Sequence, residues 1–121
     1  GTVARIVQKA VVEMRNAFHT EPSLLKACIG PGISLEHFEV GEDVYNAFCE
    51  AGFEMKEIAE KRDKWHIDLP LCNKIQLEQM GIGPEQIYDS GTCTYAHADE
   101  YFSARRLGTA SGRIFTGIML K

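Results

Sequence analysis

The stretch WHIDLPLCNKIQLEQMG, residues 65–81, decides the predicted fold, because one short run contains a strand, a helix cap, a helix and a helix stop. WHIDL predicts a strand. Asp68 is placed to cap the helix that follows, and Pro70 is tolerated in the first turn of that helix. Gly81 is expected to end the helix. A strand that leads directly into a helix indicates a fold in which both kinds of element share a core.

The rest of the chain also mixes helices and strands. Apolar residues recur at three- and four-residue steps near the start of the chain, which predicts an amphipathic helix that buries one face. The residues of that face are Val3, Ile6, Val7, Ala10, Val11, Met14 and Phe18. Other predicted elements are strands at LLKACI (24–29), HFEV (37–40) and EQIYDSG (85–91), a tight turn at GPGI (30–33), a helix at GEDVYNAFCEAG (41–52) and an exposed helix or excursion at EMKEIAEKRDK (54–64).

The C-terminal segment is predicted to form a β-hairpin. Its strands are YFSARR (101–106) and GRIFTGIML (112–120), and its turn is LGTASG (107–112). Because neighbouring side chains of a strand point to opposite faces, Ser103 and Arg105 are expected on one face and Arg106 on the other. Helices and strands that alternate in part, followed by a hairpin, favour a mixed α/β sandwich of the α+β class.

Composition and charge describe an ordinary globular chain. The 121 residues are 45% hydrophobic, enough for one domain with a core, and no apolar run approaches the roughly 20 residues that a membrane-spanning helix needs. The periodic, charged start does not resemble a signal peptide, so a cytoplasmic protein without membrane contact is expected. A net charge of −4 argues against nucleic-acid binding, whereas residues 101–121 carry bases and no acid, which suits a small anion. The alternative is that this segment neutralises the acids of residues 34–60.

The four cysteines, Cys28, Cys49, Cys72 and Cys93, are widely spaced and form no CxxC pair. A chain of this size without a secretion signal does not need a disulfide framework, so the first three thiols are expected to be reduced and mostly buried. Cys93, followed by Thr94, lies in a predicted loop after a strand, where functional side chains are often displayed. It is therefore a candidate nucleophile. A buried packing thiol is the more frequent alternative.

Several segments together resemble the YfiH/YlmD family, also called the laccase-domain or multicopper polyphenol oxidase family. In chain order they are CIGPGI (28–33), FEVGEDVYNAF (38–48), WHIDLPLCNKIQLEQMGI (65–82), CTY (93–95) and YFSARR (101–106) with GR (112–113) after it. Each segment is weak alone, but their order and spacing cover nearly the whole chain. The resemblance implies an α/β/β/α sandwich related to certain bacterial toxin hydrolases.

The same resemblance implies an enzyme that acts on purine nucleosides. Members of the family resemble purine nucleoside phosphorylases acting on adenosine, inosine and methylthioadenosine, which makes a purine nucleoside and phosphate the expected ligands. Adenosine deaminase activity has also been assigned in the family. Copper-dependent oxidation of polyphenols, the earlier assignment, is the first alternative. A non-catalytic domain that packs against another chain is the second.

The resemblance covers only the C-terminal half of that domain. Gly1 and Thr2 match the end of a His-Ala-Gly-Trp-Arg-Gly-Thr motif that precedes the first long helix in the family. The family's Cys and two His that bind zinc or copper lie upstream of this motif. We therefore expect residues 1–121 to be the C-terminal half of a single YfiH-like laccase domain, with the metal held by a missing N-terminal half. No metal ligand is assigned here, since no metal-binding spacing is formed by His19, His37, His66 and His97.

Within this half, Arg105 and Arg106 are the predicted phosphate-binding catalytic residues, beside Cys93. A guanidinium fork pairs bidentately with phosphate oxygens and stays charged at any working pH. At least one of the two arginines is nonetheless expected to be a surface or ion-pair residue. Arg113 is predicted to cross the hairpin and join the cluster, and Ser103 is predicted to bind substrate.

Gly30, Gly32 and Glu39 complete the predicted substrate site. The glycines leave backbone N–H groups unobstructed, so that a ligand or another strand can approach closely; a required tight turn is the equal alternative. Glu39 is a candidate for a sugar hydroxyl or an arginine, although a structural ion pair is the commoner role for such a carboxylate. The family usually has an aromatic residue or His where this chain has Ala104 and Asp where it has Leu107, so the edge of the pocket is expected to differ.

Overall fold

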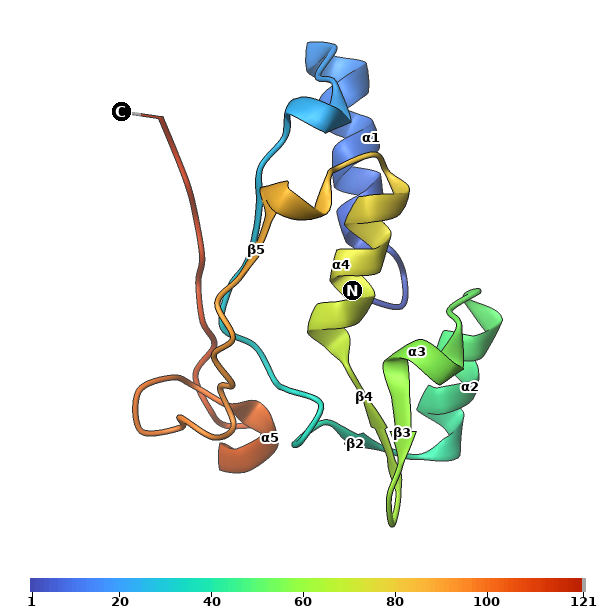
Figure 1. Ribbon diagram of the computed structural model, residues 1–121. Coiled ribbons are helices and arrows are strands. Elements are labelled where there is room, and N and C mark those ends of the chain that lie inside the picture. Colours follow the sequence, from blue (N-terminus) through green and yellow to red (C-terminus); the bar gives the residue numbers. More distant parts are fainter. Residues whose placement is uncertain (121) are drawn as a thin grey trace.

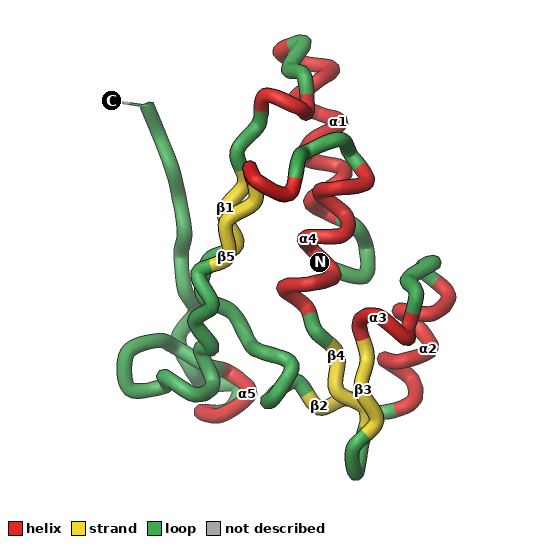
Figure 2. The backbone as a smooth tube through the Cα atoms, in the orientation of Figure 1, coloured by secondary structure: helices red, strands yellow, loops and turns green. Residues whose placement is uncertain are grey.

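The computed structural model describes residues 1–120 and confirms the α+β class, with helices and strands packed together (Figure 1). Its strands form a parallel pair, β1 (Ala27–Ile29) with β5 (Ile87–Asp89), and an antiparallel sheet in the order β2 (Glu39–Val40), β4 (Trp65–Ile67), β3 (Ala59–Lys61). Its helices are α1 (Ile6–Phe18), α2 (Glu42–Glu50), α3 (Met55–Ile58), α4 (Leu69–Gln79) and α5 (Ala104–Leu107), with 3-10 turns at Pro22–Leu24 and Pro84–Gln86. Figure 2 shows the antiparallel sheet near the start of α4 and the parallel pair to one side of that helix. No helix within residues 1–120 has the length and apolar character needed to cross a bilayer.

The segment 65–81 folds as predicted. β4 leads into α4, and the Asp68 carboxylate accepts a hydrogen bond from the Leu71 N–H at 3.0 Å, which satisfies one of the free donors at the helix start. Pro70 lies in the first turn. Gly81, with a φ of 94°, follows the helix in a conformation that favours glycine. Local chemistry thus determines both ends of α4.

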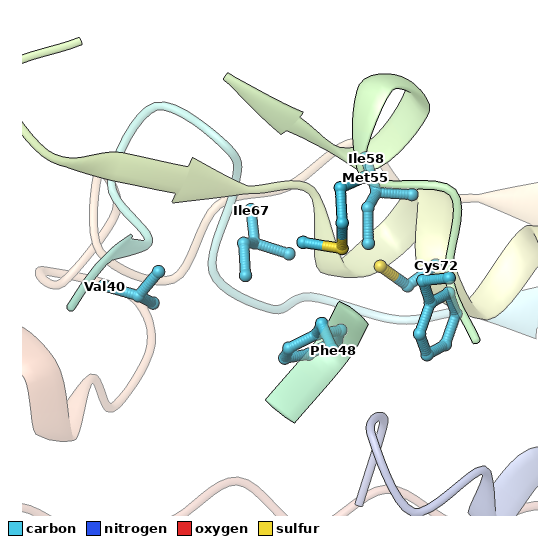
Figure 3. Close-up of a cluster of buried hydrophobic side chains, with 7 residues drawn as sticks. Val40, Phe48, Met55, Ile58, Ile67 and Cys72 are labelled. Carbon is cyan, nitrogen blue, oxygen red and sulfur yellow. The ribbon is translucent and has the colours of Figure 1, made fainter. Parts of the chain in front are cut away.

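The main core lies where β4 meets α2, α3 and α4 (Figure 3). Its buried members are Val40, Phe48, Phe53, Met55, Ile58, Ile67 and Cys72. The prediction of an exposed helix or excursion over residues 54–64 is met in part. Residues 55–58 form the helix α3, but Met55 and Ile58 are buried, because they are three residues apart and fall on the same inward face of one helical turn. The charged residues between and after them stay at the surface, and the chain continues into β3.

A second, smaller core joins α1 to α4. Val11, Leu77 and Ile82 are its buried members. The predicted burial of one whole face of α1 is met only in part: Val11 is buried, whereas Ile6 is 56% exposed and Phe18 is 76% exposed. The apolar side of α1 therefore has more surface than the described residues cover.

The predicted C-terminal hairpin is wrong. Residues 104–107 form the short helix α5, and residues 108–120 contain neither helix nor strand. Ser103 caps the helix by accepting a hydrogen bond from the Arg106 N–H at 3.4 Å, and Ala and Arg are good helix formers behind such a cap. The alternation of faces expected for a strand therefore does not apply to the arginine pair.

Part of the acidic segment, residues 34–60, is paired with nearby bases and not with the C-terminal bases. Arg62 binds Glu36 and Glu60, at 2.8 and 3.1 Å. The Arg62 guanidinium holds the pKa of Glu36 below its ordinary value, chiefly through their hydrogen bond. Lys61 and Lys64 pair with other acids of the same region. The alternative in which residues 101–121 offset residues 34–60 is not supported by any ion pair in the described part of the chain.

All four cysteines are free thiols, but their burial differs from the prediction. Cys72 is buried, as expected. Cys28 and Cys49 are exposed, which corrects the expectation for both. Cys28 lies on the outward face of β1, since its neighbours Ala27 and Ile29 alternate with it, and Cys49 lies on the outer side of α2.

Candidate functional site

The β1–β5 pairing continues past both strands to the glycine-rich segment and Cys93. Gly32 and Cys93 form a parallel bridge, in which the Thr94 N–H donates to the Gly32 carbonyl at 2.9 Å. The predicted tight turn at residues 30–33 is therefore not formed; Gly32 instead pairs with Cys93 through a single bridge. A Cβ at position 32 would meet no atom closer than the Gly30 carbonyl oxygen at 4.0 Å, and a Cβ at Gly30 would meet open space. Backbone pairing alone thus does not require either glycine.

A cavity of about 210 Å³ lies beside this bridge. Three of the predicted site residues, Gly30, Gly32 and Cys93, line it together. Residues that the sequence did not single out for the site also line it, among them Ser34, Glu36, Asp68 and Asp89. The cavity therefore brings the thiol, the two glycines and several carboxylates into one place.

The carboxylates of this cavity already have partners inside the chain. The Asp89 carboxylate accepts a hydrogen bond from the Gly91 N–H at 2.9 Å, and Asp68 caps α4. Each retains acceptor capacity beyond its one bond, because a carboxylate offers about four acceptor positions. The cavity wall can therefore accept hydrogen bonds from the hydroxyl groups of a small polar ligand.

Cys93 lies in surroundings that favour its thiolate. It is 9% exposed, and burial alone would raise its pKa. Hydrogen bonds from Ser34 and from the backbone N–H groups of Ala96 and Tyr95 outweigh burial, so the pKa of Cys93 is below its ordinary value. The Ser34 N–H donates to the Cys93 sulfur at 3.4 Å. Burial raises the pKa of Cys72, by contrast, to about 12.

We predict selective alkylation of Cys93 in a Cys28→Ser, Cys49→Ser double variant, where only Cys72 and Cys93 remain. Treatment of the native variant with iodoacetamide should modify Cys93 at a rate that rises with pH and levels off, with a midpoint below 9.0. Cys72 should react only after denaturation. Mass spectrometry of peptides measures both. A Cys93 that reacts only in the unfolded chain would remove it as a candidate nucleophile.

Arg105 and Arg106 extend from α5 to two different places. The Arg105 guanidinium donates to the Glu39 carbonyl at 2.8 Å and lies 5.0 Å from the centre of the Phe38 ring. Arg106 donates to the Tyr95 carbonyl at 2.8 Å and lies 5.5 Å from the centre of its ring. Both arginines are exposed, and neither lines the cavity beside Cys93.

Both guanidinium groups keep most of their donors free. Each uses one N–H group on a backbone carbonyl, and no carboxylate within residues 1–120 lies within ion-pair distance of either group. A guanidinium has five N–H donors, so four remain for other partners. An uncompensated, partly anchored guanidinium is suited to an anion.

Ser103 and Arg113 lie apart from the cavity. Ser103 is buried, and its hydroxyl caps α5, so its observed contact is structural. The Arg113 guanidinium donates to the backbone carbonyls of Ser111 and Gly112, in its own turn. Because the hairpin does not form, Arg113 is not brought across to Arg105.

Glu39 forms the ion pair expected of it, with Lys64. Its carboxylate lies 3.5 Å from the Lys64 ammonium and 3.7 Å from Nε2 of His66, its cross-strand partner on β4. Nδ1 of buried His66 lies 2.8 Å from the Leu35 carbonyl. That oxygen can only accept, so Nδ1 carries the proton, and Nε2 faces Glu39. This arrangement fixes β2 at the point where Arg105 attaches.

The residues of this chain do not fit a metal centre. Within residues 1–120 no three His, Cys, Asp or Glu side chains gather in a way that could hold an ion. The chemistry that these residues can supply is therefore anion binding by arginine, hydrogen bonding by the cavity wall and the reactivity of one thiol.

Comparison with known proteins assigns the family. A family model described as multi-copper polyphenol oxidoreductase laccase matches residues 1–121. The chain belongs to this laccase-like family. A purine nucleoside phosphorylase of Bacteroides thetaiotaomicron is 49% identical over 99% of the chain and 46% of its own length. Adenosine deaminase RL5, from an unknown prokaryotic organism, is 40% identical over 100% of the chain and 47% of its own length.

The same fold occurs in a solved structure of the YfiH type. The Bacillus licheniformis protein YfiH matches with a TM-score of 0.80 and 24% identity, over 88% of this chain and 41% of that one. The YfiH/YlmD resemblance is thus confirmed. The chain spans about half the length of the curated relatives it matches.

Sequence reasoning missed the residues that are defined by contacts between distant segments. Ser34 meets Cys93 across 59 positions, and His66 meets the Leu35 carbonyl across 31. The residues next to them in the sequence, Leu35 beside Ser34 and Trp65 and Ile67 beside His66, show no feature that would predict these contacts. Asp89 carried a usable signal, since a carboxylate at the end of a strand before Ser90 and Gly91 is often placed at a site edge.

Proposed function

We propose that residues 1–121 supply the phosphate-binding part of a purine nucleoside phosphorylase that acts on adenosine, inosine or methylthioadenosine. One observation carries the proposal: Arg105 and Arg106 present guanidinium groups that are anchored on backbone carbonyls and have no carboxylate partner within residues 1–120. The 49% identical relative, named a purine nucleoside phosphorylase, supports it. An N-terminal half outside this chain completes the enzyme in this proposal.

The proposed reaction places a phosphate oxygen against the sugar carbon that carries the base. The new carbon–oxygen bond forms as the carbon–nitrogen bond breaks, and the base leaves with the electron pair and takes up a proton. The products are a free purine base and a ribose 1-phosphate. In this proposal the guanidinium fork of Arg105 or of Arg106 holds the phosphate, offsets its charge and sets its orientation.

Cys93 is the second catalytic candidate. Its pKa is lowered, which favours the thiolate form, and it lines the cavity that Gly30 and Gly32 also line. Direct displacement by phosphate does not require a covalent intermediate on a cysteine, so a Cys93→Ser variant separates a chemical role from a packing role. Ser103, Glu39 and Arg113 have structural contacts here, and their roles toward substrate stay predictions.

The family description associates copper with proteins of this kind, and zinc is the other ion expected from the YfiH/YlmD resemblance. Since no described residues of this chain form a ligand cluster, we propose that any such ion is held by polypeptide outside residues 1–121. The four free thiols fit a reducing compartment, which supports the proposal of a cytoplasmic enzyme.

Three other functions are alternatives to phosphorolysis. The 40% identical relative is named an adenosine deaminase, which favours loss of ammonia from adenosine as a second activity. The family description favours oxidation of phenols. The third alternative, a non-catalytic partner-binding domain, follows if no turnover of any of these kinds is found.

Product analysis of a chimera tests the proposal. Residues 1–121 replace the matching half of the Bacteroides thetaiotaomicron relative, which supplies the remaining half in one chain. With inosine or adenosine, we expect release of free purine base that requires added phosphate and yields ribose 1-phosphate, measured by chromatography. The unmodified relative is the positive control.

Three outcomes would contradict phosphorolysis. Ammonia released from adenosine without phosphate would indicate the deaminase. Consumption of dioxygen with a phenol, without release of base, would indicate the oxidase. A folded chimera that shows none of these activities beside an active parent would indicate the non-catalytic alternative.

A further inference from the structure

The Cys93 thiol belongs to one turn of the chain and accepts a hydrogen bond from another. Its own turn, residues 93–97, is closed by the hydrogen bond from the His97 N–H to the Cys93 carbonyl at 3.0 Å. The Ser34 N–H, in the second turn, donates to the Cys93 sulfur at 3.4 Å. A hydrogen bond to the charged form of a group favours that form. The ionisation of the thiol therefore depends on how the two turns lie against each other.

The second turn, residues 34–38, is closed by Ser34 itself. Its carbonyl accepts hydrogen bonds from the N–H groups of His37 and Phe38, at 3.1 and 2.9 Å. The residue that donates to the sulfur is thus tied through its own carbonyl to the backbone of His37. A contact that fixes His37 therefore also fixes Ser34.

Such a contact exists between the two turns, because the rings of His37 and Tyr95 are stacked. Their centroids are 4.6 Å apart, and their planes differ by 19°. Both side chains are half-buried. A stacked pair of rings contributes about 1 kcal/mol beyond the area that it buries. The stack therefore holds the turn of Ser34 on the turn of Cys93.

The arginines of α5 hold the same two turns. Arg106 donates to the Tyr95 carbonyl, within the turn of Cys93, and Arg105 donates to the Glu39 carbonyl, directly after the turn of Ser34. In Figure 1, α5 lies beside the segment that leads into β2. Since both arginines extend from one short capped helix, they fix the spacing of the two turns around the stack.

We infer that His37 and Tyr95 are a positioning pair for Cys93, whose stacked rings hold the Ser34 N–H against the sulfur. Neither ring lines the cavity beside Cys93, so both act through the two turns and not on a ligand. This role rests on the proposed function, which gives the thiol its use. Simple packing of two surface rings is the alternative, and it would leave the ionisation of the thiol unchanged.

The pH profile of Cys93 alkylation tests the pair without requiring turnover. Iodoacetamide is added to this chain in the background that keeps only Cys72 and Cys93. His37→Ala should move the midpoint of the profile to higher pH by about half a unit, a roughly threefold loss of thiolate below the midpoint, because the Ser34 N–H is no longer held at the sulfur. His37→Phe keeps a ring that can stack and should restore the midpoint.

The midpoint separates positioning from exposure. A thiol that is merely more exposed reacts faster at every pH, whereas a weaker hydrogen bond moves the midpoint. The charged side chains that line the cavity, Glu36, Asp68 and Asp89, are the same in all variants, so their effect on the thiol is constant. Circular dichroism confirms that each variant is folded.

His97→Ala is the matched control, since His97 is an exposed histidine in the turn of Cys93 and lies outside the stack. Its midpoint should equal that of the background. Tyr95→Leu removes the other ring and keeps the carbonyl that Arg106 binds, so it should act like His37→Ala. The double variant should move the midpoint no further than either single variant, because both remove one contact.

Three results would overturn the role of the pair. They are an unchanged midpoint in His37→Ala and Tyr95→Leu, an equal displacement in His37→Phe, and an equal displacement in His97→Ala. If His37→Ala does not fold, Tyr95→Leu carries the test. Each of these results would leave phosphorolysis by the chimera standing. The expected displacement in a chimera without phosphorolysis would support the pair and count against the proposed function.

Discussion

Replacing Arg105 by alanine in the chimeric enzyme is expected to lower kcat/KM for phosphate by about a hundredfold, since a charged, bidentate contact to an anion would be lost. The Arg105 guanidinium has no carboxylate partner within residues 1–120, so its removal should leave no buried acid unpaired. The variant should therefore keep its fold. Arg105→Lys should recover only part of the activity, because lysine keeps the charge and loses the planar fork.

The measurement is the rate of base release as phosphate is varied, with circular dichroism to confirm folding. Arg15→Ala is the control, because Arg15 is also an exposed arginine but lies in the last turn of α1. Unchanged phosphate kinetics in Arg105→Ala would remove Arg105 from the site. An equal loss in Arg15→Ala would indicate a general effect of net charge.

Ile67→Ala should be the most destabilising simple truncation of the main core. Ile67 has no exposed surface and belongs to the cluster formed by β4, α2, α3 and α4. Loss of the buried methyl groups and the cavity left behind should lower the free energy of unfolding by about 3 kcal/mol. In Figure 3 the Ile67 side chain lies beside that of Met55 within this cluster.

Urea denaturation of the isolated chain measures the change. Ile118→Ala is the matched control, because Ile118 is fully exposed in the C-terminal segment and its truncation should change the free energy of unfolding by less than about 0.5 kcal/mol. Similar losses of unfolding free energy in the two variants would show that the core cluster is not the main source of the chain's stability.

The predictable elements are those whose determinants lie within one turn or one strand. Helix α2 could be predicted from its two ends. Glu42 and Asp43 lie in its first turn, and Gly52, with a φ of 90°, follows its end. The segment 101–106 was wrongly predicted as a strand, because YFSARR begins with an aromatic pair typical of strands. The Ser-Ala-Arg-Arg run that follows this pair also suits a capped helix, and that helix is what forms. The helix prevails because its hydrogen bonds are local, whereas a strand needs a neighbour to pair with.

The sequence predicted which residues belong to the candidate site, but not where they lie in the fold. The sequence suggested Gly30, Gly32 and Cys93, and folding brought these three to one cavity. It suggested the arginines through a strand geometry that does not form, so their actual anchors on the carbonyls of Glu39 and Tyr95 could not be foreseen.

By itself, then, the sequence determined the α+β class and the capped helix of residues 65–81, because caps and glycine stops act over short stretches of chain. It also determined the family, because the order and spacing of the motifs can be followed along the whole chain. Only the tertiary structure decided that Arg105 attaches to Glu39 across 66 positions, that Ser34 reaches the Cys93 sulfur, and that α1 and the C-terminal segment leave apolar surface open. The physical reason is loop closure: contacts between distant segments depend on how the whole chain packs, and no local pattern encodes them.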